Sequence, residues 1–120
     1  MQNPSILIIE DEDGIREGLG LSLKVGGYHV LVASNGREGL DILSQITPPQ
    51  LIFLDLMMPV MNGWEFIENI KNNEKLSKIP IVVISAYSEQ VQSIQSQGFL
   101  KKPIDLKLLY QTAKEWCEVI

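Results

Sequence analysis

Short apolar runs alternate with amphipathic stretches along most of this chain. Alternation of this kind is typical of βαβ units, in which parallel strands are connected by helices. The sequence therefore predicts an α/β fold, a doubly wound five-stranded parallel sheet with helices on both faces. The five predicted strands are Ile6–Glu10, His29–Ala33, Leu51–Asp55, Ile81–Ser85 and Gly98–Lys101.

The predicted strands differ in how apolar they are. The first, third and fourth are apolar on both alternating sets of positions, as expected of central strands that are covered on both faces. The second and fifth are weaker, and we expect them at the edges of the sheet.

The predicted helices begin at residue types that favour an N-cap or a tight turn. The expected starts lie near Asp13, Gly36, Asn62, Ser88 and Asp105. In the last helix an apolar set with helical spacing predicts the face that packs on the core. Its members are Leu106, Leu109, Tyr110, Ala113, Trp116, Cys117 and Ile120.

Length and composition narrow the class of protein. The 120 residues, 45% of them hydrophobic, suit one domain over residues 1–120 with a single core and no output domain in this chain. The 10 basic and 15 acidic residues give a net charge of -5 without a Lys/Arg-rich block. This balance argues against direct contact with nucleic acid and favours proteins or cations as partners.

The sequence also indicates a compartment. A single cysteine, Cys117, excludes an intrachain disulfide and a cysteine-based zinc site. No apolar run approaches the roughly 20 residues that a membrane-spanning helix needs, and the N-terminus lacks a signal-peptide pattern. We expect a soluble, cytoplasmic protein without membrane insertion.

Polar residues stand at the carboxyl ends of four predicted strands. Ligands of open parallel sheets bind outside these ends, so the residues there are expected to form one site. Taken singly, each has an ordinary explanation: an acid can solvate a loop, a serine can bond the backbone, and a lysine can lie in solvent. Together they place three acids, a hydroxyl and an ammonium at one edge: Glu10, Asp11, Asp55, Ser85 and Lys102.

The three acids raise an electrostatic problem. Two carboxylates about 4 Å apart repel each other by roughly 4 kcal/mol at an effective dielectric constant near 20. Clustered acids are therefore protonated, bound to a cation or strongly destabilising. With oxygen ligands and no histidine or cysteine among them, Mg2+ or Mn2+ is favoured over zinc.

Four motifs extend this pattern over the whole chain. They are ILIIEDE, LIFLDLMMPVMNG, IVVISA and FLKKPID, in this order. In order and spacing they resemble the receiver domain of two-component response regulators, the CheY-like module that accepts a phosphoryl group from a sensor histidine kinase. The resemblance implies a flavodoxin-like sheet with the strand order 2-1-3-4-5.

The resemblance also implies a role for each matching acid. Asp55 would be the phosphorylation site, which takes a phosphoryl group from a sensor histidine kinase or a phosphotransfer protein. Glu10 and Asp11 match the family's acidic pair. Together with Asp55 and the backbone carbonyl of Met57 they would bind Mg2+, for which Mn2+ can substitute, and Asp11 is the expected direct ligand of the pair.

The other matching residues imply a switch. Lys102 would pair with the Asp55 carboxylate and then with the phosphoryl group, and the bond from Lys102 to Pro103 is expected to be cis. The Ser85 hydroxyl would bind a phosphoryl oxygen, and this movement would let Phe99 turn inward and change a protein-binding surface. Such a domain is not an enzyme, although it assists its own phosphorylation and dephosphorylation.

The sequence departs from the family at two places. Phe99 lacks the hydroxyl of the tyrosine that is common at this position. Lys102 follows Ser85 by 17 positions (102 minus 85), which is shorter than usual by at least one helical turn of about 3.6 residues. The fourth helix region is therefore expected to be shortened, and the family's usual output surface does not carry over.

Two other classes of function fit the sequence less well. A hydrolase of the haloacid dehalogenase kind would need an Asp-x-Asp motif, but Met57 stands where its general acid would be. A receiver-like protein-interaction domain that works without phosphorylation is the alternative, and the presence of Asp55, Ser85, Lys102 and the acidic pair argues against it. His29 and Cys117 are interpreted as a surface residue and a core thiol.

Overall fold

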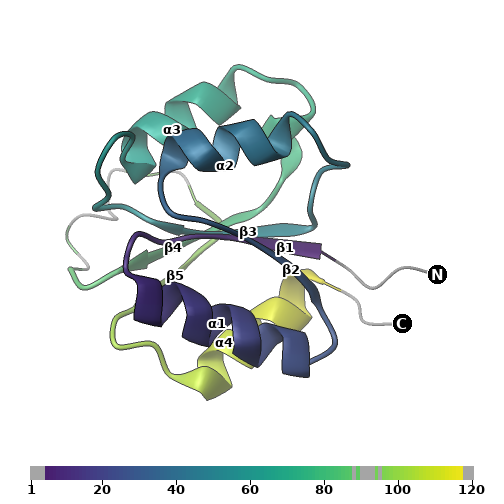
Figure 1. The fold of residues 1–120 in the computed structure, drawn as a ribbon, viewed down its shortest axis with the longest axis vertical. Coiled ribbons are helices and arrows are strands. Elements are labelled where there is room, and N and C mark those ends of the chain that lie inside the picture. The colour runs from purple at the N-terminus through teal and green to yellow at the C-terminus, as the bar shows by residue number, and fades with distance from the viewer. Residues whose placement is uncertain (1–4, 88, 90–93, 95, 118–120) are drawn as a thin grey trace.

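A computed structural model describes residues 5–87, 89, 94 and 96–117. At its centre is a five-stranded parallel sheet with the order β2-β1-β3-β4-β5 (Figure 1). This confirms the predicted sheet and places the two weaker strands at its edges. The strands are β1 (Ser5–Ile9), β2 (His29–Ala33), β3 (Leu51–Asp55), β4 (Ile81–Ser85) and β5 (Gly98–Lys101).

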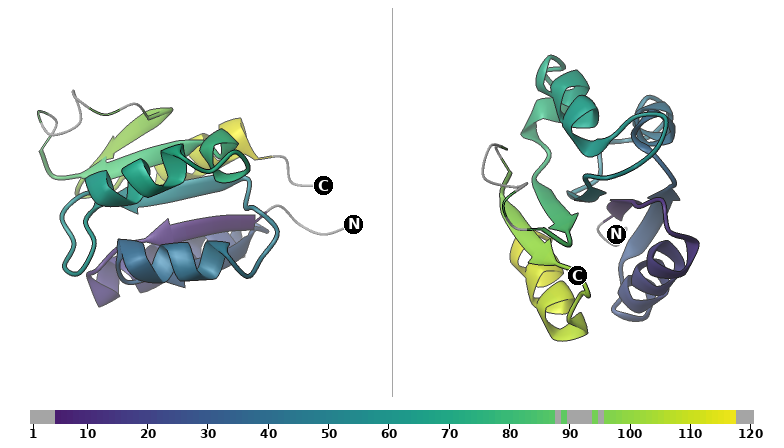
Figure 2. Two further views of the ribbon diagram at one scale, coloured as in Figure 1. Left: turned by 90° about the horizontal axis from the view of Figure 1, so that it is seen from above. Right: turned by 90° about the vertical axis from the view of Figure 1, so that its left-hand side faces the viewer.

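Helices lie on both faces of the sheet. Figures 1 and 2 show α1 and α4 on one face and α2 and α3 on the other, which confirms the doubly wound arrangement. Their bounds are α1 (Asp13–Val25), α2 (Gly36–Leu43), α3 (Gly63–Lys71) and α4 (Leu106–Trp116), and a short 3-10 helix, η1 (Leu76–Lys78), was not predicted. The helix expected to start near Ser88 falls partly on residues outside those described.

Three of the helices begin at side-chain caps. The Asn35 side chain accepts a hydrogen bond from the Glu38 N–H at the start of α2, and Asp105 caps α4 by accepting one from Lys107. Asn62 and Glu65 form a reciprocal capping box at α3. Such caps satisfy backbone donors that the first helical turn leaves unpaired, which explains why the predicted starts agree with the observed ones to within one residue.

The core has two layers, one on each face of the sheet. Alternate residues of β1 enter different layers: Ile6 and Ile8 pack with α1 and α4, whereas Leu7 and Ile9 pack on the side of α2 and α3. Every residue of β3 is buried. Asp55, the last residue of that strand, is therefore carried into an interior position.

The predicted core-facing stripe of α4 is only partly correct. Leu109 and Ala113 are fully buried, but Leu106 is 50% exposed and Tyr110 is 38% exposed. The stripe is wider than the contact that α4 makes with the sheet. Tyr110 instead reaches α1, where its hydroxyl donates to the Ser22 carbonyl oxygen at 3.2 Å. Ile120 lies outside the described residues.

The two residues interpreted as a surface residue and a core thiol lie where the sequence predicted. His29 is exposed on the edge strand β2. Cys117 is buried, and burial raises the pKa of its thiol to about 11. A thiol of this kind stays protonated and unreactive near neutral pH.

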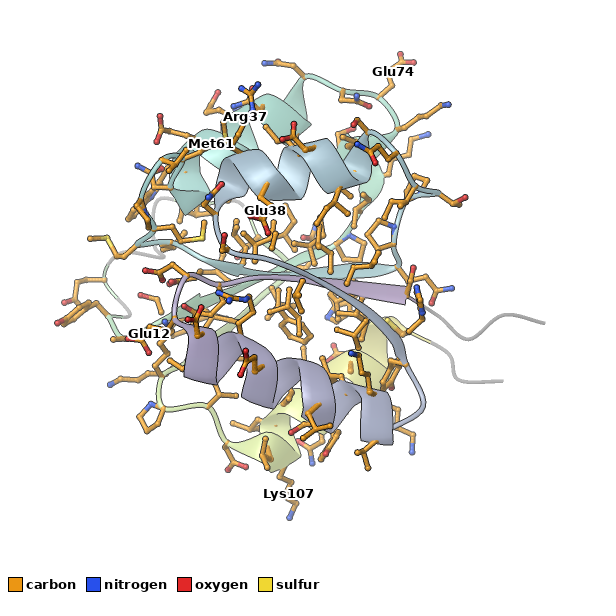
Figure 3. The ribbon with its side chains drawn as sticks, viewed as in Figure 1. Glu12, Arg37, Glu38, Met61, Glu74 and Lys107 are labelled. Carbon is orange, nitrogen blue, oxygen red and sulfur yellow. The ribbon has the colours of Figure 1, made fainter. Side chains whose placement is uncertain are left out.

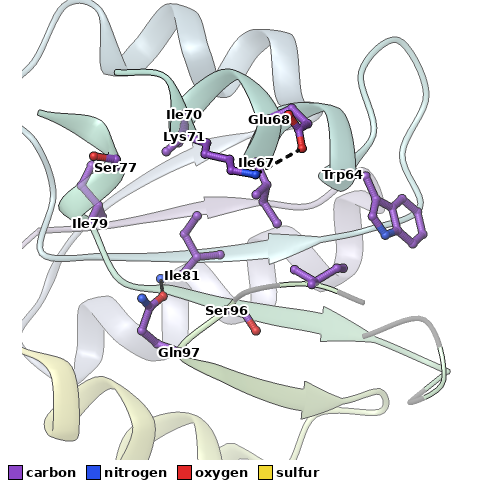
Figure 4. Close-up of a pocket in the computed structure, with 11 residues that line it drawn as sticks. Trp64, Ile67, Glu68, Ile70, Lys71, Ser77, Ile79, Ile81, Ser96 and Gln97 are labelled. Carbon is purple, nitrogen blue, oxygen red and sulfur yellow. Dashed lines mark hydrogen bonds and ion pairs between the residues drawn. The ribbon is translucent and has the colours of Figure 1, made fainter. Parts of the chain in front are cut away.

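A groove of about 590 Å³ opens between α3, η1 and strand β4 (Figure 4). Residues 88, 90–93 and 95, which lie between β4 and β5 in the sequence, are outside the described residues. At one side of the groove the Gln97 side chain accepts a hydrogen bond from the Ile81 N–H at 2.7 Å. Apolar side chains from α3 and β4 line much of the groove: Trp64, Ile67, Ile70 and Ile81.

No helix among those described is both long enough and apolar enough to cross a bilayer.

Candidate functional site

The carboxyl ends of the central strands meet at one edge of the sheet. The ladder continues past the strands, because the Glu10 N–H donates to the Ala33 carbonyl at 3.0 Å and the Lys102 N–H donates to the Ser85 carbonyl at 2.9 Å. Figure 3 shows Glu12, which follows this end of β1, and Met61, which follows β3, at the same end of the molecule. The predicted site residues are thus brought to one place.

Three acids form the centre of this site. Glu10, Asp11 and Asp55 each offer a carboxylate oxygen, and these oxygens lie within 4.8 Å of one another. Glu10 is fully buried and Asp55 is 4% exposed, whereas Asp11 is partly exposed. The cluster predicted from the sequence is therefore present, and Asp11 is its most accessible member.

Lys102 brings one positive charge to the acids. Its ammonium lies 2.7 Å from Glu10 Oε1 and 3.5 Å from Asp55 Oδ2. The second oxygen of Glu10 accepts a hydrogen bond from the Glu12 N–H at 3.1 Å. Lys102 is therefore held more closely by Glu10 than by Asp55, a preference that the sequence did not predict. The peptide bond from Lys102 to Pro103 is cis, as the resemblance implies.

The surroundings change the acidity of two groups. The pKa of Asp55 is raised to about 7, first by burial and then by the nearby charge of Glu10, which raises it more than the charge of Lys102 lowers it. Burial alone would lower the pKa of Lys102, but its hydrogen bond with Glu10 and the charge of Asp55 raise that pKa above its ordinary value. In the metal-free protein, a proton on Asp55 and the ammonium of Lys102 together offset the negative charge of the three acids.

Ser85 lies at the same edge. It is 2% exposed, and its Oγ accepts a hydrogen bond from the Tyr87 N–H at 3.1 Å and donates to the Tyr87 carbonyl at 3.2 Å. The hydroxyl is thus bound to the loop that follows β4. To donate to a ligand on Asp55, the hydroxyl would have to give up its bond to the Tyr87 carbonyl.

Phe99 lies one strand further along the sheet. It is half-buried on β5 and packs against the apolar layer beneath α2 and α3. Its neighbour Leu100 enters the opposite layer. The side chain of Phe99 therefore lies on the face of the sheet that α2 and α3 cover.

The loop from β3 to α3 carries Met57, whose side chain is 58% exposed. Val60 in this loop has φ 67°, a left-handed conformation that is rare for a branched residue. The loop is tied down on both sides: the Gly36 N–H donates to the Met61 carbonyl and the Gly63 N–H donates to the Leu56 carbonyl, each at 3.0 Å.

The sequence did not reveal two of the groups that hold the site. A Cβ on Gly63 would lie 2.7 Å from the Asp55 carbonyl oxygen, so the chain requires glycine directly beside the acidic residue. Arg16 of α1 donates to the carbonyl oxygens of Glu10 and Asp11. Two features of the sequence could have pointed to these groups: the Asn62-Gly63 pair, and the position of Arg16 one turn after the acidic cluster. Both features are common in surface loops, so neither is specific.

The donor set fits a hard divalent cation. Three carboxylates face one ammonium, so two negative charges are left over when all four groups are ionised. The buried Glu10 Oε1 has no partner other than the Lys102 ammonium among the described residues. Carboxylate oxygens in such number are the ligands that Mg2+ and Mn2+ prefer.

Comparison with known proteins gives consistent results. A family model described as the response regulator receiver domain matches residues 6–114. A response regulator of Streptococcus pneumoniae is 37% identical over 115 residues, which make up 92% of this chain and 51% of the relative. The chain thus spans about half the length of the curated relatives that it matches.

Solved structures agree in fold. The signal receiver domain of a histidine kinase from Syntrophus aciditrophicus is 30% identical, with a TM-score of 0.86 over 94% of this chain and 89% of that one. A chemotaxis response regulator of Vibrio cholerae is 25% identical, with a TM-score of 0.86 over 95% of this chain and 98% of that one.

Proposed function

This chain belongs to the family of response regulator receiver domains of two-component signalling systems, and we propose that it signals by accepting a phosphoryl group on Asp55. The observation that carries the proposal is the interior carboxylate of Asp55, grouped with two further acids and one lysine at the ligand-binding edge of a parallel sheet. Buried charges of this kind are costly, and phosphoryl transfer at a cation site is a use that explains them.

The proposed step is transfer from a phosphohistidine. A carboxylate oxygen of Asp55 attacks phosphorus, the phosphorus–nitrogen bond breaks, and the imidazole leaves with the electron pair. Phosphoryl transfer of this kind depends on alignment and on neutralising charge at the equatorial oxygens. Lys102, whose ammonium lies 3.5 Å from the Asp55 carboxylate, supplies one such charge.

Glu10, Asp11 and Asp55, with the Met57 carbonyl, would hold Mg2+, and Mn2+ can substitute for it. When bound, the cation supplies a second positive charge for the phosphoryl oxygens. The raised pKa of Asp55 supports this assignment, since the cation would replace a proton that the cluster otherwise retains.

The proposed output is a change of surface. Ser85 would exchange its bonds with Tyr87 for a phosphoryl oxygen, and Phe99 would move deeper into the layer against which it already packs. A protein target would then read the altered surface. The domain assists its own phosphorylation and dephosphorylation but acts on no separate substrate.

A second groove supports a protein as the phosphoryl donor. It measures about 330 Å³, is mainly apolar, and lies between α1 and the chain that joins β5 to α4. Lys102 lines both this groove and the acidic site. A helix of a sensor kinase or phosphotransfer protein could pack there with its histidine near Asp55.

Labelling with a small phosphodonor tests the proposal. Acetyl phosphate with Mg2+ should add one phosphoryl group to the wild type, measured as intact mass, and none to Asp55→Asn. Asp41→Asn is the matched control, because Asp41 is an exposed acid on α2, and it should label fully. EDTA should abolish labelling. Equal labelling of Asp55→Asn and the wild type would overturn the assignment.

A further inference from the structure

Arg16 is a basic residue of α1 that lies largely inside the protein. Its side chain is 15% exposed, and its Nη2 lies 2.5 Å from Asp13 Oδ1. Its Nη1 donates to the backbone carbonyl oxygen of Glu10 at 2.9 Å and to that of Asp11 at 3.3 Å. One guanidinium therefore binds the main chain of both members of the acidic pair.

These two carbonyls belong to the point at which the chain leaves the sheet. β1 ends at Ile9 and α1 begins at Asp13, so only a short turn separates strand from helix. The carboxylates of Glu10 and Asp11 reach the Asp55 carboxylate, while their carbonyls are bound by Arg16. The direction of the acidic side chains thus depends on a turn that Arg16 holds.

We propose that Arg16 is a positioning residue for the divalent-cation site, which orients the Glu10 and Asp11 carboxylates by fixing their backbone. This inference rests on the proposed function, because it assumes that a cation binds these acids. Groups that orient metal ligands without touching the metal change metal affinity by about tenfold to a hundredfold when they are removed. The planar fork of arginine suits two acceptors at once, whereas the ammonium of lysine acts as a point charge.

The charge of Arg16 would have the opposite effect. A positive group near the acids repels a cation, so if charge alone mattered, its removal would tighten Mg2+ binding. If positioning matters, the same removal weakens it. The sign of the change therefore separates the two roles.

Calorimetric titration of the folded proteins with Mg2+ measures this sign. We expect Arg16→Gln to raise the Mg2+ Kd by about tenfold or more. Arg16→Lys keeps the charge but loses the fork, and it should also bind Mg2+ more weakly than the wild type. Unchanged or tighter binding in Arg16→Gln, or an Arg16→Lys Kd equal to that of the wild type, would overturn the inference.

Arg37→Gln is the matched control, because it removes the same charge elsewhere. Arg37 is an exposed residue of α2 that pairs with Asp41 at 3.7 Å, and Figure 3 shows it on the opposite side of the sheet from Glu12. Its Mg2+ Kd should match that of the wild type. Thermal melts without Mg2+ identify a temperature at which all variants are folded, and the titrations are done there. If Arg16→Gln is unfolded at every usable temperature, the Arg16→Lys titration decides the result.

Asp11→Ala distinguishes failure of this inference from failure of the proposed function. Wild-type protein that binds no Mg2+, or binds it as well after Asp11→Ala, would overturn the proposed site itself. Wild-type binding that is lost in Asp11→Ala but unaffected in both Arg16 variants would overturn only the role of Arg16.

Discussion

At the scale of single residues, the site is a balance between burial and charge. Asp55 ends a strand whose residues are all buried. Burial and the charge of Glu10 raise its pKa to about 7, which favours a proton on this carboxyl when no metal is bound. Lys102 offsets part of the negative charge by pairing with Glu10 and Asp55. Each of these compensations has a measurable consequence.

The first prediction concerns pH. Because burial and the charge of Glu10 raise the pKa of Asp55 from 3.8 to about 7, the metal-free folded protein keeps a proton that the unfolded chain loses between these pH values. Stability without metal should therefore fall as pH rises from about 4 to about 7, and Mg2+ must displace this proton to bind. The Mg2+ affinity should rise by up to about tenfold per pH unit below about 7 and level off above it.

Isothermal titration in a pH series measures this dependence. Asp55→Asn lacks the titrating carboxyl, so its weaker Mg2+ binding should change little over the same range. A wild-type affinity that is independent of pH below about 7 would contradict the raised pKa.

The second prediction compares two adjacent lysines. Lys102 is the one described ammonium within 4 Å of the acidic cluster, whereas Lys101 is exposed. Lys102→Met leaves buried acids without their partner and should lower the free energy of unfolding of metal-free protein by on the order of 3 kcal/mol. Lys101→Met, which removes the same charge, should change it by less than about 0.5 kcal/mol.

Urea unfolding with and without Mg2+ provides both values. Mg2+ should recover more stability in Lys102→Met than in the wild type, because the cation no longer competes with an ammonium for the same oxygens. Equal losses in the two variants would show that Lys102 does not stabilise the cluster.

At the scale of elements, the loop from β3 to α3 follows Asp55 and carries Met57. Val60 is held at φ 67°, while Gly36 and Gly63 make close backbone contacts on either side of the loop. At Gly63 an added Cβ would meet the Asp55 carbonyl oxygen at 2.7 Å and the Leu56 Cα at 2.8 Å. These are backbone atoms, which cannot move aside as a flexible side chain would.

The third prediction tests this close packing. Gly63→Ala should destabilise the protein by about 1–3 kcal/mol, as overpacking does, and should weaken Mg2+ binding because the backbone of Asp55 is displaced. Gly18→Ala is the matched control: a Cβ there meets nothing within 4 Å, and in a helix interior it should stabilise by about 1 kcal/mol. Thermal denaturation and Mg2+ titration of both variants provide the comparison, and a neutral Gly63→Ala would contradict the account.

The fourth prediction concerns Phe99 on β5. Burying a phenylalanine ring contributes roughly 1.5–3 kcal/mol, enough to bias a two-state surface by about one to two orders of magnitude. Phe99→Ala should still accept phosphate on Asp55 but lose most of the change that follows, whereas Phe99→Tyr should be tolerated.

Amide NMR shifts induced by beryllofluoride, a phosphoryl mimic, report that change. In the wild type they should extend from the site into β5 and α4, and in Phe99→Ala they should stay near Asp55 and Ser85. If the shifts in Phe99→Ala spread as far as in the wild type, the ring is not the coupling element.

The elements were largely predictable because their signals are local. Asn62 and Asp105 are residue types that cap helices, and they predict where α3 and α4 start. The apolar runs of β1, β3 and β4 predict strands that are covered on both faces. The exposure of Leu106 and Tyr110 was not predictable from helical spacing. It depends on how far α4 overlaps its neighbours, which periodicity does not encode.

At the scale of the whole molecule, topology brings distant residues together. Glu10, Asp55 and Lys102 come from three separate strand ends, and the parallel order of the sheet alone makes them neighbours. The sequence predicted that they meet, although the strand order itself came from the family resemblance. It did not predict that Lys102 prefers Glu10 or that Arg16 binds the backbone of the acidic pair, since both depend on side-chain geometry across elements.

The central claim is that Asp55 itself receives the phosphoryl group. Borohydride reduces an aspartyl phosphate to homoserine, so wild-type protein labelled by acetyl phosphate with Mg2+ can be reduced, digested with trypsin and sequenced by mass spectrometry. The peptide that spans residues 38–71 holds both Asp41 and Asp55. Homoserine at position 55, with Asp41 unchanged, is the predicted result, and homoserine at any other position with aspartate intact at 55 would contradict the account.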